Sequence, residues 1–155
     1  MKTAIAAVAA VAAVVLTVFA SLASAAPDGL VALKSANDAK TTMDKFEAIA
    51  KERGLQVFAR IDHAAGAQKV GKTLRSTEVL IFGNPMGGTL LMECAQSAGI
   101  DLPLKALAWE DAQGQVWLGY NDPAWIGKRH EAATCAVIEN LKKALIGLAQ
   151  AATVK

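Results

Sequence analysis

The sequence predicts an α+β domain in which helices pack on a roughly five-stranded mixed or antiparallel sheet. Two observations support this prediction. Short segments with strand periodicity alternate along the chain with segments of helical periodicity. In addition, Asp111-Ala112-Gln113-Gly114 has the composition of a type I turn and joins two of the strand segments as a hairpin. Strands that both alternate with helices and pair directly with each other indicate the α+β class.

Residues 1–25 have the organisation of an export signal. A short basic start at Lys2 precedes an apolar run at 4–20, and Ala23-Ser24-Ala25 provides the small residues of a cleavage site. The run is mostly alanine and no Lys or Arg cluster follows it, which disfavours a retained membrane anchor. We therefore expect an exported protein, periplasmic or secreted, in which residues 26–155 form one domain outside the membrane.

The first half of this domain begins with a strand at 30–34. Ser35 with Asp38 resembles a capping box, and the helix that follows ends before Gly54. Residues 55–61 alternate between apolar and other side chains, which predicts a half-buried strand ending at Asp62. An alanine-rich short helix is expected at 63–70.

The second half contains a continuous apolar run at 77–83, which is typical of a central strand. A loop at 84–88 leads into a helix that Gly99 ends. The hairpin strands occupy 104–110 and 115–120. Asp122-Pro123 then provides an N-cap and a proline at the first helical position, and the last helix runs to about Ala151.

Cys94 and Cys135 are the two cysteines of the chain. In an oxidising compartment an even count permits one disulfide, and the alternative is two small buried apolar residues. The chain has no CxxC or HxH spacing, so we expect neither a metal nor another cofactor. The formal net charge of +2 is interspersed along the chain and gives no basic stripe for nucleic acid.

His63 and His130 are the two histidines and the candidate acid–base residues. A carboxylate partner could come from Asp62, Glu110 or Asp111, and the alternative is a structural role for each histidine. The sequence shows no GxSxG motif, no Ser-His-Asp arrangement and no catalytic cysteine signature.

The loop that starts at Asn84 joins a strand to a helix, where backbone N–H groups can hold an anion. It lacks both the Walker and the GxGxxG patterns, and turn chemistry alone also explains its glycines. On the hairpin, Trp109 and Trp117 are expected to pair across the strands, or else to form a stacking platform for a ligand.

Polar residues at element ends are predicted to converge on one cleft, because functional groups collect on loops held by a rigid sheet. The candidate ligand-binding residues are His63, Asn84, Glu110, Tyr120, Asn121 and His130.

Several ordered segments resemble one family: Ile61-Asp62-His63, TEVLIFGNP at 77–85, GTLLM at 88–92, IDLPLKAL at 100–107, Trp109-Glu110-Asp111 and WLGYNDP at 117–123. Together they are similar to the family catalogued as domain of unknown function 302, over roughly Leu30 to His130. The resemblance implies an α+β domain with helices packed on a sheet, and it implies no established activity, substrate or cofactor. Family members tend to carry a lysine where this chain has Met86, and the two cysteines are not part of the family pattern.

The resulting hypothesis is a small-ligand binding or accessory module, with a small molecule or an anion as the ligand. One alternative is an acid–base enzyme that uses His63 or His130 with a carboxylate. The other is an oligomeric scaffold, for which a homodimer would be the simplest form and an exposed apolar patch the expected feature.

Overall fold

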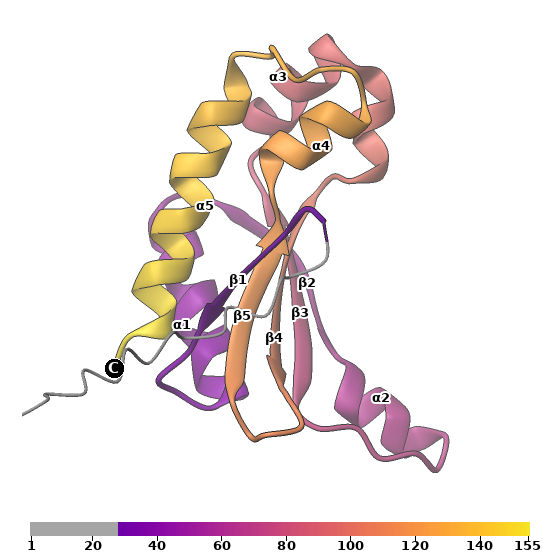
Figure 1. Ribbon diagram of the computed structural model, residues 1–155, viewed down its shortest axis with the longest axis vertical. Helices are drawn as coiled ribbons and strands as arrows, with labels where there is room; N and C mark the ends of the chain where they lie inside the picture. Colours follow the sequence, from indigo (N-terminus) through magenta and orange to yellow (C-terminus); the bar gives the residue numbers. More distant parts are fainter. Residues whose placement is uncertain (1–27) are drawn as a thin grey trace, which may run out of the picture.

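Within residues 28–155, which the computed structural model describes, five strands form one antiparallel sheet in the order β1-β5-β4-β3-β2 (Figure 1). The predicted export signal at 1–25 lies outside the described residues. The predicted α+β class is confirmed, and the sheet is antiparallel throughout. The strands are β1 (Leu30–Lys34), β2 (Gln56–Asp62), β3 (Thr77–Gly83), β4 (Leu104–Glu110) and β5 (Val116–Asn121).

The antiparallel order gives the sheet two different ends. At the hairpin end, defined by Asp62 and Glu110, lie the turn between β4 and β5 and helix α2 (His63–Lys69). At the cap end, defined by Gly83 and Asn121, lie helices α3 (Pro85–Cys94) and α4 (Pro123–Arg129) (Figure 1). The short 3-10 helix η1 (Gln96–Ile100) follows α3 directly.

Helices α1 (Ala39–Glu52) and α5 (Val137–Thr153) cover one face of the sheet and bury the main core. Phe46 of α1 and Phe82 of β3 are almost completely buried, and their rings meet edge to face with centroids 5.1 Å apart. Burial of a side chain of this size contributes about 1.5–3 kcal/mol. The same cluster includes Met43, Leu80, Leu118, Leu145 and Leu148.

The opposite face of the sheet carries the expected tryptophan pair. Trp109 lies opposite Trp117 across β4 and β5, and their rings stack with centroids 6.4 Å apart. The Trp117 indole donates a hydrogen bond of 2.8 Å to the Asp111 carboxylate. This bond holds the pKa of Asp111 below its ordinary value. The predicted turn is also present, since Gly114 N–H donates to the Asp111 carbonyl.

Three predicted helix boundaries were wrong. The N-cap of α1 is Asp38, whose side chain accepts from Thr41 N–H, whereas Ser35 is buried and hydrogen-bonds the Thr42 hydroxyl at 2.6 Å. The helix after Asn84 starts at once, with Pro85 in its first turn, so most of the predicted loop is helical. That helix ends at Cys94, well before Gly99, because the chain turns into η1.

A disulfide joins Cys94, the last residue of α3, to Cys135, which precedes α5, with Cα atoms 6.1 Å apart. The prediction that these residues lie close enough to bridge is confirmed. The bridge spans a second apolar cluster at the cap end, which includes Leu91, Ile126 and Ile138. The cap end is therefore held both by its own small core and by a covalent link.

Candidate functional site

An apolar pocket lies at the cap end, between the end of β3, helix α3, η1 and helix α5. Its cavity of about 390 Å³ falls within the size range of ordinary small-molecule sites. Residues from six elements or their flanking loops line it, including Leu55, Phe58, Phe82, Met92, Leu102 and Leu145. Phe58 is 48% exposed, so an aromatic ring stands where the pocket meets solvent.

Two glycines in the first half of α3 keep this pocket open. A Cβ atom on Gly87 would lie 3.6 Å from a Leu141 methyl, and one on Gly88 would lie 3.7 Å from a Leu102 methyl. Both are ordinary contact distances, so packing does not require glycine at either position. Glycine inside a helix costs about 1 kcal/mol relative to alanine. These residues therefore weaken the helix while leaving space beside it.

Polar groups are few at the pocket. Asn84 lines it and caps α3, because its side-chain oxygen accepts from Met86 N–H at 2.8 Å. Thr89, one turn into the same helix, adds an exposed hydroxyl. An apolar wall with a small number of polar groups at its edge is the usual composition of a site for a small organic molecule.

A second cluster at the cap end joins η1 to the end of α4. His130 Nε2 lies 2.7 Å from Asp101 Oδ2, and His130 Nδ1 lies 3.0 Å from the Ser97 hydroxyl oxygen. The side chains of His130 and Asp101 are only 8% and 10% exposed, whereas Ser97 is exposed. A hydroxyl, an imidazole and a carboxylate thus form one hydrogen-bonded chain that opens to solvent at the hydroxyl.

Arg129 completes this cluster. Its guanidinium donates to both oxygens of the Asp101 carboxylate, at 2.9 and 3.2 Å, and lies 5.5 Å above the Trp125 ring. The guanidinium and the carboxylate form an ion pair, so these hydrogen bonds are charge-assisted. Asp101 therefore has two partners, Arg129 and His130, which together hold η1 against α4.

Residues 31–148 match the family described as "Domain of unknown function DUF302". The chain belongs to the DUF302 family. A crystal structure of an uncharacterized conserved DUF302 protein from Bacillus stearothermophilus has the same fold, with a TM-score of 0.73. That comparison covers 81% of this chain and 99% of the other at 16% sequence identity, so the likeness concerns the fold alone.

Proteins of Brucella are also similar to this DUF302 chain. "Fluoride-specific ion channel FluC 1" of Brucella suis biovar 1 is 49% identical over 107 residues, which is 69% of this chain and 42% of that protein. The protein of the same name from Brucella abortus biovar 1 matches at the same identity over 40% of its length. The chain thus spans about two fifths of the length of these curated relatives. Among residues 28–155, no helix is long and apolar enough to cross a membrane.

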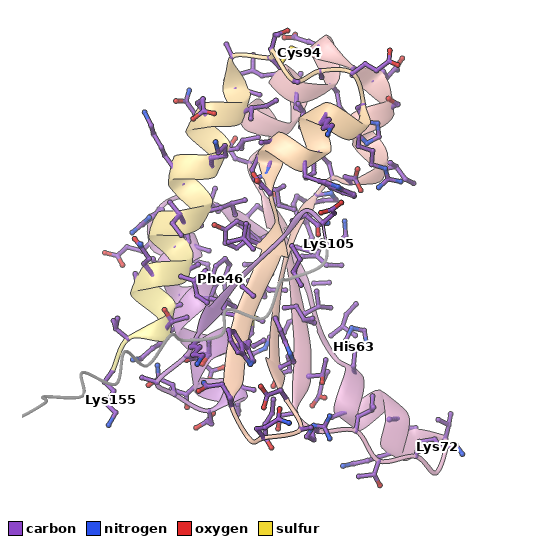
Figure 2. The ribbon with its side chains drawn as sticks, in the orientation of Figure 1. Phe46, His63, Lys72, Cys94, Lys105 and Lys155 are labelled. Carbon is purple, nitrogen blue, oxygen red and sulfur yellow. A yellow bond between two sulfur atoms is a disulfide. The ribbon has the colours of Figure 1, made fainter. Side chains whose placement is uncertain are left out.

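The six predicted site residues of this DUF302 domain do not meet in one cleft, so the prediction of a single site was wrong. Asn84, Tyr120, Asn121 and His130 lie at the cap end. His63 and Glu110 lie at the hairpin end, and Figure 2 shows His63 far from Cys94, which marks the cap. The physical reason is strand direction, because antiparallel neighbours end at opposite edges of the sheet.

The four predicted residues at the cap end have different roles. Tyr120 belongs to the main core, where burial and then the charge of Asp122 raise the pKa of its hydroxyl. Asn121 is exposed at the end of β5. Asn84 lines the pocket, and His130 belongs to the hydrogen-bonded cluster. Of the four, only Asn84 and His130 therefore lie in an arrangement that could bind a ligand or support a reaction.

The residues at the hairpin end are not near either arrangement. His63 is exposed as the first residue of α2, whose N-cap is Asp62. Glu110 ends β4, and its carbonyl accepts from Arg75. The Asp111 carboxylate accepts a hydrogen bond from the Trp117 indole. The expectation that Glu110 or Asp111 would serve His130 was therefore wrong, because its carboxylate partner is Asp101.

Sequence reasoning missed Ser97 and Asp101. Ser97 lies in η1, where the sequence predicts the end of a helix that Gly99 closes, and Asp101 directly follows η1. The available signal for Asp101 was its position in the sequence, directly before Leu102-Pro103 and between a predicted helix and a predicted strand. Among residues 28–155, no group of three His, Cys, Asp or Glu side chains is placed to hold a metal ion.

Proposed function

We propose that this domain binds a small apolar or amphiphilic molecule in the pocket between β3, α3, η1 and α5, and that it acts as an accessory module outside the cytoplasm. The observation that supports binding most directly is the 390 Å³ apolar cavity with glycines on its helical wall. A cavity of this size and composition is costly to a protein that does not use it, since empty apolar space forfeits packing contacts.

Two observations support export. The sequence pattern at 1–25 is that of a cleaved signal, and the cysteines of the domain are bridged. Disulfides persist in oxidising compartments such as the periplasm and are rare in the cytosol. An accessory role agrees with the Brucella relatives, in which the matching region accounts for about two fifths of a protein named as an ion channel.

The binding proposal is tested by filling the cavity from its helical wall. Dodecanoate and 1-anilinonaphthalene-8-sulfonate serve as probes, and their affinity is measured by calorimetry and fluorescence with the purified protein. Gly88→Met should weaken binding at least about tenfold, equivalent to about 1.4 kcal/mol, because the new side chain occupies the cavity.

The matched control is Gly66→Met in α2. Gly66 is also a helical glycine, but nothing lies within 4 Å of the position of its Cβ atom. This variant should bind both probes as the natural protein does. Equal affinities in all three proteins, or no binding by any of them at millimolar probe, would contradict the proposal.

A second candidate function is self-association through the sheet face that α1 and α5 leave uncovered. One row of partner residues crosses all five strands on this face and is entirely apolar: Ala32, Gly119, Leu107, Val79 and Ile61. Ile61 is 42% exposed, which is high for an isoleucine in a sheet. Ala32, Leu107 and Val79 are half-buried, and Gly119 is buried beneath the Trp109 ring, so Trp109 provides the surface there. Exposed apolar side chains on one sheet face are typical of an interaction site.

The occupant that we propose for this face is a second copy of the chain. The face of one copy, with five strands about 4.8 Å apart and about 20 Å long, has an area of roughly 500 Å². Two copies packed face to face would therefore bury roughly 1,000 Å² in total. That area is at the lower limit for a specific interface and predicts a weak, concentration-dependent dimer. Light scattering after size exclusion should show the dimer at high concentration and a monomer for Leu107→Lys, with Gln113→Lys in the hairpin turn as the control. A monomer at all concentrations would exclude this function.

A further inference from the structure

The bonding around His130 fixes which ring nitrogen carries the proton. The Asp101 carboxylate accepts two hydrogen bonds from the Arg129 guanidinium, and an ionised carboxylate can only accept hydrogen bonds. Nε2 of His130, 2.7 Å from Asp101, must therefore be the protonated nitrogen. In the neutral imidazole the lone pair of Nδ1 then faces the Ser97 hydroxyl at 3.0 Å and accepts a hydrogen bond from it. A serine hydroxyl that donates to an imidazole base, which a carboxylate in turn orients, is the arrangement that activates a serine nucleophile.

The surroundings of the three groups suit that role. His130 and Asp101 are shielded from water, while the Ser97 hydroxyl lies at the surface where a substrate can reach it. The chain near them is covalently linked, since the bridge joins Cys94, two residues before η1, to Cys135, five residues after His130. Glu131, which follows the C-cap residue His130, has a φ of 58°, a left-handed conformation that turns the chain away after α4.

We propose that Ser97 is a nucleophile for carboxylic esters, with His130 as its general base and Asp101 as the residue that positions the imidazole. The Ser97 oxygen attacks the ester carbonyl carbon while its proton passes to His130 Nδ1. The bond from that carbon to the leaving oxygen then breaks, and the alcohol departs with the proton from Nδ1. Water repeats the sequence on the acyl-serine, releasing the carboxylic acid and restoring Ser97. Asp101 stays ionised throughout.

The arrangement uses the imidazole in the reverse sense from the serine proteases, in which Nε2 faces the serine. Either ring nitrogen can act as the base, because the carboxylate decides which of them is protonated. The alternative is a purely structural cluster that only fastens η1 to α4. The contacts of Asp101 are sufficient for that role, and a structural cluster would not make the exposed Ser97 hydroxyl react faster than other serines.

Selective labelling tests this difference. The intact, disulfide-bonded protein is treated with a fluorophosphonate probe, and modified peptides are identified by mass spectrometry, with hydrolysis of 4-nitrophenyl acetate as the activity readout. We expect labelling at Ser97, its loss in Ser97→Ala, and a decrease of at least about 100-fold in labelling and hydrolysis rates in His130→Gln. Asp101→Asn should also slow both, because an amide no longer fixes the imidazole.

Ser76→Ala is the matched control, since Ser76 is also an exposed serine and precedes β3 at the hairpin end. It should change neither readout. Circular dichroism of each variant separates lost reactivity from lost folding, and Ser97→Ala removes only a surface hydroxyl. The proposal is overturned if Ser97 in the natural protein is labelled no faster than Ser76, or if folded His130→Gln is labelled at the natural rate.

Discussion

Removal of the bridge between Cys94 and Cys135 should lower the free energy of unfolding by about 4 kcal/mol. The bridge closes a loop with a sequence separation of 41 residues. The chain-entropy relation assigns a loop of this length about 4 kcal/mol at 25 °C, because the cross-link restricts the unfolded chain. The loop includes β4, β5 and α4, so its closure constrains the part of the chain that builds the centre of the sheet and the cap.

The assay compares the natural protein with a double variant, Cys94→Ser with Cys135→Ser. Cys94 is exposed and Cys135 partly so, which means that serine adds little buried polar surface at either position. For a domain of this size each kcal/mol shifts Tm by roughly 3–4 °C, so Tm should fall by roughly 12–16 °C. A reductant should lower Tm of the natural protein by a similar amount and leave that of the double variant unchanged.

A small effect would refute this reasoning. If the double variant lost less than about 1 kcal/mol, closure of the 41-residue loop would not be what the bridge contributes. The unfolded chain would then already be compact in this region, or the bridge would be opposed by strain in the folded cap.

Three further predictions concern the main core and its flank. Arg60→Met should lower the free energy of unfolding by about 1–3 kcal/mol, because Glu78, only 14% exposed, loses its guanidinium partner; an unchanged urea midpoint would count against it. Leu80→Ala should cost about 2–5 kcal/mol in the same assay, since Leu80 is fully buried, and a cost under 1 kcal/mol would contradict this packing. The hydrogen bond from Lys51, followed by that from Arg60, lowers the pKa of Glu47 in the folded state. Its stabilising contribution is therefore complete above the unfolded pKa of about 4.3 and is lost as the pH falls through the lower folded value, so Tm should decline between pH 5 and 2. A decline of equal size in Glu47→Gln would argue against this assignment.

Local signals in the sequence predicted most of the fold. The alternation at 55–61 and the apolar run at 77–83 gave two strands, and the Asp111–Gly114 turn gave the hairpin. The Trp109–Trp117 pair followed from the hairpin register alone. Each of these features is decided by residues close together in the sequence, where periodicity and turn chemistry act.

The candidate site was predicted less well because it depends on strand order and on loop packing. The sequence does not state that β2 and β3 are antiparallel neighbours, which separates His63 from Asn84 by the length of the sheet. Nor does it state that the turn after α4 brings His130 back onto η1. Both facts are set by long-range contacts that have no local pattern.

The positions of the pocket and of the Ser97 cluster have a common physical origin. At the cap end, the connection from β3 to β4 and the chain after β5 both contain helices, and these helices enclose space that the sheet alone could not. The bridge ties one connection to the other, from the end of α3 to Cys135, two residues before the start of α5. At the hairpin end the connections are a tight turn, the short link from β1 to α1, and α2, a helix that buries none of its residues. Functional groups can be held in a fixed geometry only where surrounding structure determines their positions, so the cap is the end of this sheet at which binding or catalysis can be built. A polar residue at the hairpin end, such as His63, has no such support, and its exposure follows from the same topology.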